Sequence, residues 1–141
     1  MGKLLQRLSD ASRSGVYRAP RADAILESVR GSPISAVRIS LSGVSEKQAL
    51  LEQIARTLEF PGWFGGNWDA LEDCLTDLSW LQGAGHVLLI EDAAQLARDD
   101  RGVLADILAS AAAYWAERGK PFFAVFIGEA PGLAELYREK Q

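Results

Sequence analysis

Three short segments of the chain carry the hydrophobic patterns of β-strands. Residues 37–42 alternate between hydrophobic and polar side chains, which predicts a strand that is covered on one face. Residues 86–90 (HVLLI) and 122–127 (FFAVFI) are continuous hydrophobic runs, which are typical of strands buried on both faces. We therefore expect strands in these three segments.

Between and around these strands, hydrophobic residues recur with the spacing of helices. The expected helices cover residues 45–58, 67–78 and 99–118, with shorter ones at 22–30 and 133–139. A capping box at residues 45–48 (SEKQ) opens the first long helix, and Asn67 suits the N-cap of the second. Asp99 or Asp100 is expected to cap the third, and Gly119 to follow its C-terminus.

The order of these elements is strand, two helices, strand, helix, strand. Strands that alternate with helices predict an α/β fold, here a small three-stranded parallel sheet covered by helices. Residues 1–35 are polar and interrupted by glycine and proline, so we interpret them as an N-terminal extension with one short helix. Residues 36–141 are expected to form the folded domain.

The helix that follows Asn67 separates hydrophobic from acidic side chains. Leu71, Leu75 and Leu78 share one face with Cys74 and are expected in the core, where Cys74 would be an inert buried thiol. The opposite face carries Asp69, Glu72, Asp73, Thr76 and Asp77. Acids four residues apart repel each other, at about 0.2–0.5 kcal/mol per pair. A face with acids and no base predicts a positively charged partner.

Negative charge is also concentrated in the longer segment that surrounds this helix. The whole sequence has a net charge of −4, from 15 Lys and Arg against 19 Asp and Glu. Residues 57–97 hold seven of the acids and no Lys or Arg, for a net of −7, so the remainder carries +3. Such an acidic region repels nucleic acid and attracts basic proteins. We expect a basic protein as the partner and no nucleic acid.

The composition of the chain also excludes several classes of protein. A length of 141 residues with 48% hydrophobic residues predicts one folded domain with a real core. A single cysteine allows no internal disulfide, and one Cys with one His makes a zinc site improbable. The first ten residues are too polar for a signal peptide, and no segment has the ~20 hydrophobic residues of a membrane span. We expect a cytoplasmic protein with no membrane contact and no cofactor.

The segment from Trp63 to Leu75 reads WFGGNWDALEDCL and resembles the signature of the barstar family, the intracellular inhibitors of barnase-like bacterial ribonucleases. The family pattern is two aromatic residues, Gly, any residue, Asn, any residue, Asp-Ala-Leu, any residue, Asp, and Leu two positions on. Every element of that pattern is present. The resemblance extends over about residues 36–128, and it implies a three-stranded parallel sheet with helices.

The resemblance also implies a function and a set of residues. In that family the acidic helix and the aromatic loop before it block the basic active site of a ribonuclease, without being an enzyme. Asp69 and Asp73 would then mimic substrate phosphates, and Trp63 would stack on the enzyme. The partner-binding residues implied are Trp63, Gly65, Asn67, Trp68, Asp69, Glu72, Asp73, Thr76 and Asp77.

Some positions outside the fixed elements of that pattern depart from the founding member of the family. Glu72 replaces an aromatic residue, Trp68 is added, and a later acid of the family falls at Ala113 or Tyr114, with Glu117 one turn on. These departures leave the identity of the partner open.

Other interpretations remain at this point. The domain could bind another basic protein, such as a different toxin or a regulator. An Asp-rich helix could also hold Mg²⁺ or support acid–base catalysis, for which Glu91, Asp92 and Glu117 are the candidate helpers, and His86 lacks a catalytic partner at any telling spacing. The acidic face could be merely solvated, and Asn67 merely a helix cap. We expect Trp63 to be solvent-exposed and Phe64 to cover the core.

Overall fold

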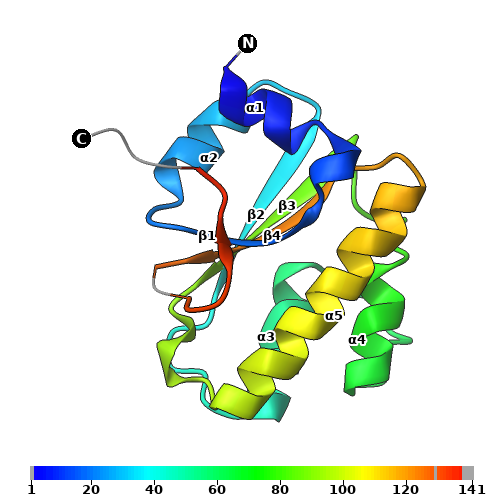
Figure 1. The fold of residues 1–141 in the computed structure, drawn as a ribbon. Helices are drawn as coiled ribbons and strands as arrows, with labels where there is room; N and C mark the ends of the chain where they lie inside the picture. Colours follow the sequence, from blue (N-terminus) through cyan, green and yellow to red (C-terminus); the bar gives the residue numbers. More distant parts are fainter. Residues whose placement is uncertain (1, 129, 138–141) are drawn as a thin grey trace.

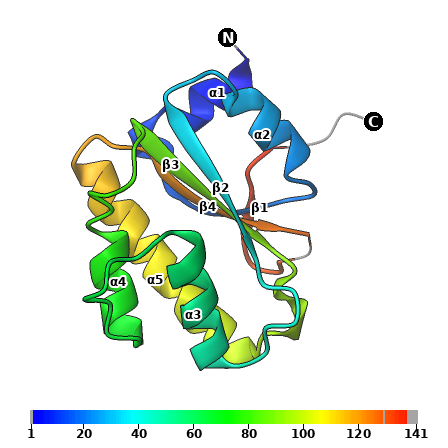
Figure 2. The ribbon, with the colours of Figure 1, turned by 180° about the vertical axis from the view of Figure 1, so that it is seen from behind.

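Parallel strands form a single sheet with helices on both of its faces (Figures 1 and 2). The computed structural model describes residues 2–128 and 130–137. Within them the sheet has five strands in the order β2-β3-β4-β1-β5. The strands are β1 Gly15–Ala19, β2 Ile34–Ser40, β3 Gly85–Glu91, β4 Phe122–Ile127 and β5 Ala134–Glu135. The α-helices are α1 Lys3–Leu8, α2 Asp23–Val29, α3 Lys47–Thr57, α4 Trp68–Leu75 and α5 Arg98–Glu117, and short 3₁₀ turns cover Ala11–Arg13 and Ala93–Gln95.

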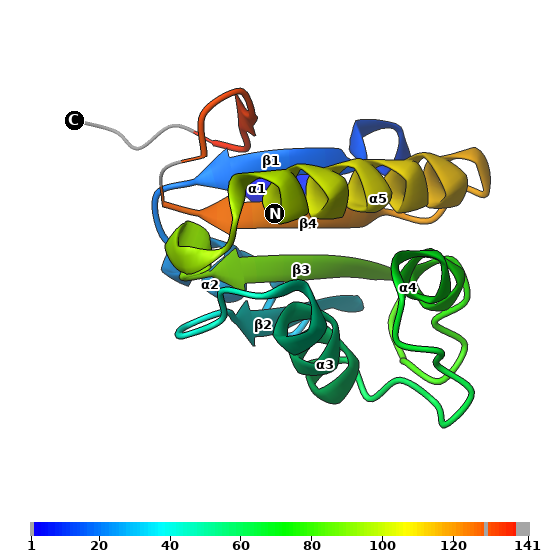
Figure 3. The ribbon, with the colours of Figure 1, turned by 90° about the horizontal axis from the view of Figure 1, so that it is seen from below.

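The two central hydrophobic strands each serve two layers. On β3, Leu88 and Ile90 face the layer of α3, α4 and α5, whereas Val87 and Leu89 face the layer of α1 and α2. Figure 3 shows α3, α4 and α5 lying across the first of these faces. Because side chains alternate along a strand, a strand covered on both sides must be hydrophobic at every position. This explains the continuous hydrophobic runs of β3 and β4.

The three strands expected from the sequence are confirmed, and so is their parallel pairing. β2 pairs with β3 from Ile34 to Ser40, and β3 pairs with β4 from His86 to Ile90. β2 begins three residues earlier than expected, and its last expected residues lie in the turn that follows. Leu41, just past the strand, still donates a backbone hydrogen bond to the carbonyl of Glu91 at 2.8 Å.

The number of strands was wrong, because the sheet extends beyond β4. β1 pairs with β4 over all five of its residues, and β5 pairs with β1 at Tyr17 and Arg18. Only Ala19 of β1 is fully buried, so this strand lacks the hydrophobic pattern that marks β3. The helix expected at 133–139 is also wrong where the structure describes it, since Ala134–Glu135 is a strand; residues 138–139 lie outside the described residues.

Residues 2–33 contain β1 and also the two helices, α1 and α2, that cover one face of the sheet. The short helix expected at 22–30 is confirmed as α2. Leu8 of α1 and Ile25 of α2 pack with Phe123 and Val125 of β4, and all four side chains have 0% exposure. The N-terminal segment therefore supplies both a neighbouring strand for β4 and the second helical layer.

Two of the expected helix caps were wrong. α3 begins at Lys47 after Glu46, which makes no side-chain capping bond, and Gln48 instead bonds to the loop before α4. The N-cap of α5 is Ala97, so Asp99 and Asp100 lie inside the first turn. There their charges still suit the helix dipole. Gly119 after α5 has a φ of +73°, as expected of a residue that follows a helix C-terminus.

His86 is the buried polar side chain of this core, with 1% exposure. It shares its side of β3 with Leu88 and Ile90, and neither ring nitrogen has a hydrogen-bond partner among the described residues. Burial disfavours the imidazolium, and the charge of Lys120 adds to this effect. Together they lower the pKa of His86 from 6.5 to about 4.

We expect His86 to make the fold acid-sensitive. The unfolded chain takes up a proton below pH 6.5, whereas the folded chain resists protonation until about pH 4. The free energy of unfolding should therefore fall as the pH drops through this window, by about 2 kcal/mol from pH 7 to pH 5. Urea unfolding at both pH values should show this loss, and His86→Leu should remove about that much of the difference. An equal pH dependence in the variant would contradict the assignment to His86.

Candidate partner-binding surface

The acidic helix α4 begins at the expected residue. The Asn67 side chain accepts a hydrogen bond from the Ala70 backbone N–H at 2.7 Å, so Asn67 is the N-cap. Leu71, Cys74 and Leu75 are completely buried, which confirms the predicted core face. The pKa of the Cys74 thiol is raised to about 11, first by burial and then by the nearby charges of the acidic face, so the thiol is unreactive at neutral pH.

The carboxylates of α4 lie on the face of the helix opposite to the buried leucines. Asp69 and Asp73 are exposed and Glu72 is half-buried. None of the three forms an ion pair in the part of the chain that the structure describes. The Lys47 ammonium lies 5.7 Å from the ring centre of Trp68, at the start of this helix. The acidic face thus keeps its charge for a ligand.

The end of α4 differs from the prediction. The helix stops at Leu75 with Thr76 as its C-cap, and the Thr76 hydroxyl donates a hydrogen bond to the Glu72 carbonyl at 2.9 Å. Asp77 lies beyond the helix, where its carboxylate accepts a bond from the Ser79 N–H at 3.3 Å. Leu78, also expected in the helix, has a positive φ of 51° but is buried as predicted. Asp77 is therefore not stacked one helical turn above Asp73.

The loop before α4 rests on an aromatic cluster. The Phe60 ring lies between Phe64 and Trp80, at centroid distances of 5.0 and 5.9 Å. The Trp80 indole N–H donates to the Leu58 carbonyl at 2.8 Å, which fixes this ring at the end of the preceding helix. The Trp63 ring packs edge-on against Trp80, with 6.4 Å between the ring centroids. The rest of the Trp63 side chain is exposed, and 56% of the residue's surface is accessible. The expected exposure of Trp63 and partial burial of Phe64 are both confirmed.

Two further contacts hold the loop at the start of α4. Gly66 adopts a φ of +72°, a conformation that favours glycine, and its carbonyl accepts a bond from the Gln48 side chain at 3.3 Å. At Gly65 an added Cβ would meet Ala70 at 3.6 Å, an ordinary contact, so sterics do not require glycine there. Trp68 is half-buried against the main core, as expected of a packing residue. The sequence did not indicate this hydrogen bond from Gln48 to Gly66, because the pattern at residues 45–48 predicts that Gln48 belongs to a capping box.

The end of α5 borders α4. The Trp115 indole N–H donates to the Leu75 carbonyl at 2.8 Å, which joins the last turns of the two helices. Next to it, the Arg118 guanidinium lies 3.5 Å from the ring centre of Tyr114, one of the two positions, with Ala113, where the resemblance places a later acid of the family. Glu117 is exposed and 3.9 Å from Arg118. Tyr114 and Arg118 were not singled out as a pair, although their spacing of four places them on one helix face.

The arrangement suits contact with the basic side chains of a partner protein better than it suits metal binding or catalysis. Both oxygens of Glu91 accept bonds from Arg38 at 2.9 Å, which lowers the pKa of Glu91 and commits this carboxylate to the sheet. Within residues 2–128 and 130–137, no group of three His, Cys, Asp or Glu side chains could hold a metal ion. What the surface offers is an exposed indole beside unpaired carboxylates.

A family model described as Barstar (barnase inhibitor) matches residues 34–127. The chain belongs to the barstar family. Members of the barstar family are non-enzymatic inhibitors that bind barnase-like ribonucleases. The matched region runs from the first residue of β2 to the last residue of β4, so it contains the three strands expected from the sequence, and β1 and β5 lie outside it. No curated protein matches this chain. None of the described helices is long and hydrophobic enough to cross a membrane.

The cap of this barstar-family helix gives a test of how the surface is built. Asn67→Ala removes the acceptor for the Ala70 N–H and should lower the free energy of unfolding by about 1 kcal/mol. Asn67→Asp keeps an acceptor oxygen and should stay within a few tenths of a kcal/mol of the original chain. Urea unfolding measures both variants. If Asn67→Asp lost as much stability as Asn67→Ala, the side chain would have a role other than capping.

Proposed function

We propose that this chain inhibits a barnase-like bacterial ribonuclease by placing α4 and the loop before it in the basic active site of the enzyme. The observation that supports this most directly is the pair of exposed, unpaired carboxylates, Asp69 and Asp73, on the motif helix of a barstar-family domain. A ribonuclease site binds phosphate and is therefore basic. Carboxylates with no ion-pair partner among the described residues suit such a site because they make charge-assisted hydrogen bonds to Arg and Lys.

The proposed contact residues divide by role. Asp69, Asp73 and the half-buried Glu72 would face the enzyme's cations. Trp63 would be the aromatic anchor, since a rigid exposed indole beside charged groups is a typical interface hot spot. Gly65 and Trp68 would complete the contact at the start of the helix. Asn67 and Thr76 hold the two ends of α4, and Asp77 would add charge from beyond it.

Rigidity supports this proposal as much as charge. The loop is held by Gln48 and by the aromatic cluster around Trp80, and the last turn of α4 is held by Trp115. A surface that is already ordered loses little conformational entropy on binding, so more of the interaction energy appears as affinity.

A different basic protein is the second candidate partner. The reason is the Arg118–Tyr114 pair. Tyr114 is one of the two positions, with Ala113, where a later acid of the family falls, and Arg118 adds a cation there that also lies 3.9 Å from Glu117. A partner that faces Arg118 would have an acidic group at that point, which is not a feature of a uniformly basic phosphate site.

The proposed function can be tested by capture followed by an activity assay. The purified chain should retain a basic protein from lysate of its host, and the retained protein should cleave RNA until one equivalent of the chain is added. The double variant Asp69→Asn, Asp73→Asn should capture and inhibit far less. Asp23→Asn, which neutralises one exposed acid on α2 at the other face of the sheet, is the control and should behave like the original chain. Capture of a basic protein without ribonuclease activity would favour the second candidate.

We expect Asp73 to serve binding and not folding. Asp73→Ala relieves repulsion from Asp69 one turn away, so the free chain should melt at the same or a slightly higher temperature. Binding to the captured ribonuclease should weaken by about 2–5 kcal/mol, mainly because the complex dissociates faster. Measurements on barnase and barstar themselves contribute to this general range. Added salt should slow association of the original chain, because steering acts at long range.

Thermal melts and binding kinetics distinguish the outcomes for Asp73. A variant that melts much lower would show that Asp73 supports the fold. A variant that binds unchanged would remove Asp73 from the interface.

A further inference from the structure

A hollow of about 400 Å³ lies between the start of α5, the end of β4 and residues 130–133. Its lining includes Arg98, Arg101, Gly102, Ala105, Phe126 and Leu133. Phe126 is the second-last residue of β4 and so lies at the carboxyl end of this strand. Open parallel sheets bind small ligands beyond the carboxyl ends of their strands, and ligand sites commonly have volumes of about 300–1,000 Å³.

The side chains of the two arginines of this hollow have no partner among the residues that the structure describes. Arg101 is half-buried and Arg98 exposed, and neither forms a hydrogen bond or an ion pair from its side chain within the described residues. Asp99 and Asp100 are their neighbours in sequence, but neither pairs with them. A half-buried guanidinium with no partner favours an anion at that point.

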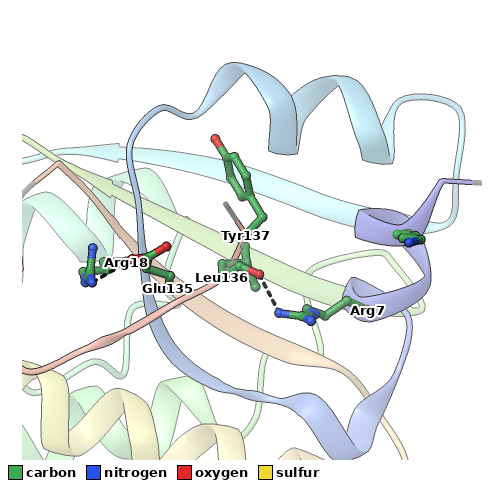
Figure 4. Close-up of a pocket in the computed structure, with 6 residues that line it drawn as sticks. Arg7, Arg18, Glu135, Leu136 and Tyr137 are labelled. Carbon is green, nitrogen blue, oxygen red and sulfur yellow. Dashed lines mark hydrogen bonds and ion pairs between the residues drawn. The ribbon is translucent and has the colours of Figure 1, made fainter. Parts of the chain in front are cut away.

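Another hollow, near the C-terminal segment, is also lined by arginines, but its arginines have partners (Figure 4). It has a volume of about 600 Å³. There, Arg7 donates to the Leu136 carbonyl at 2.6 Å, and Arg18 donates to the Leu133 carbonyl at 2.8 Å and to Glu135 at 3.1 Å. Those guanidinium groups hold the C-terminal segment against β1, so their charge is already used.

Gly102 keeps the smaller hollow open. It lies inside α5, where glycine costs about 1 kcal/mol relative to alanine. A Cβ at this position would meet no atom within 4 Å, so packing does not require glycine. The missing side chain leaves space over the hydrophobic wall formed by Phe126 and Leu133.

We propose that this hollow binds a small amphipathic anion. Its carboxylate or a similar acid group would bind Arg98 and Arg101, and its hydrophobic body would lie against Phe126 and Leu133. The site is separate from the ribonuclease-binding surface, because α4 contacts α5 through Trp115 in its last turns, whereas this hollow uses the first turns. The inhibitor function does not depend on it.

Fluorescence titration with 1-anilinonaphthalene-8-sulfonate, an aromatic sulfonate, tests the site in the full chain. We expect saturable binding at pH 7 to the folded protein, and displacement of the dye by octanoate. Octanol, which has the same body without the charge, and sulfate, which has charge without the body, should each compete at least about tenfold less well. Equal competition by octanol would overturn the role of the arginines, and the absence of saturable binding would overturn the site.

Three variants locate the binding. Arg98→Ala combined with Arg101→Ala should weaken dye binding about tenfold or more, and Gly102→Leu should do the same by filling the hollow. Arg13→Ala is the control. It removes an exposed arginine that does not line this hollow and should change binding less than about twofold. Thermal melts confirm that each variant is folded; Gly102→Leu should melt at or above the original temperature, since leucine is the better helix former. Unchanged binding in the double arginine variant or in Gly102→Leu would place the dye elsewhere.

Discussion

Burial of β3 and β4 on both of their faces is the constraint on which the rest of the structure depends. A strand with hydrophobic side chains on both sides needs a layer of cover above and below, and hydrogen-bonded neighbours at both edges. Helices α3, α4 and α5 supply one layer and α1 with α2 the other. The same requirement fixes the neighbours of these strands, β2 beside β3 and β1 beside β4.

The acidic surface is possible because α4 separates its two tasks by helix face. Its buried leucines hold it on the core, so its outer face is free to carry carboxylates that would destabilise an isolated helix. The cap at Asn67 and the hydrogen bond from Trp115 to Leu75 then fix the two ends of a helix only eight residues long. Such a short helix would be marginal in water without this support.

The sequence predicted those parts of the molecule whose pattern is local. The runs at β3 and β4, the core face of α4 and the Asn67 cap all follow from a few neighbouring residues. β1 did not, because it is half-exposed and is a strand only through its pairing with β4, more than a hundred residues away. The contact from Gln48 to Gly66 likewise joins two elements that are separate in the sequence. For the site, the motif identified the helix and loop, whereas the placement of Asp77 and of Tyr114 with Arg118 required coordinates.

The addition of β1 and β5 changes what the borders of the sheet expose. An uncovered β4 would present a hydrophobic strand with free backbone groups, which is a template for joining another chain. Instead the sheet ends on one side in a strand of two residues, and on the other in β2, which carries the charged side chain of Arg38. Short and charged borders hinder strand-to-strand association between molecules. Both borders of the sheet therefore disfavour edge-to-edge pairing, and this effect is independent of the acidic face of α4.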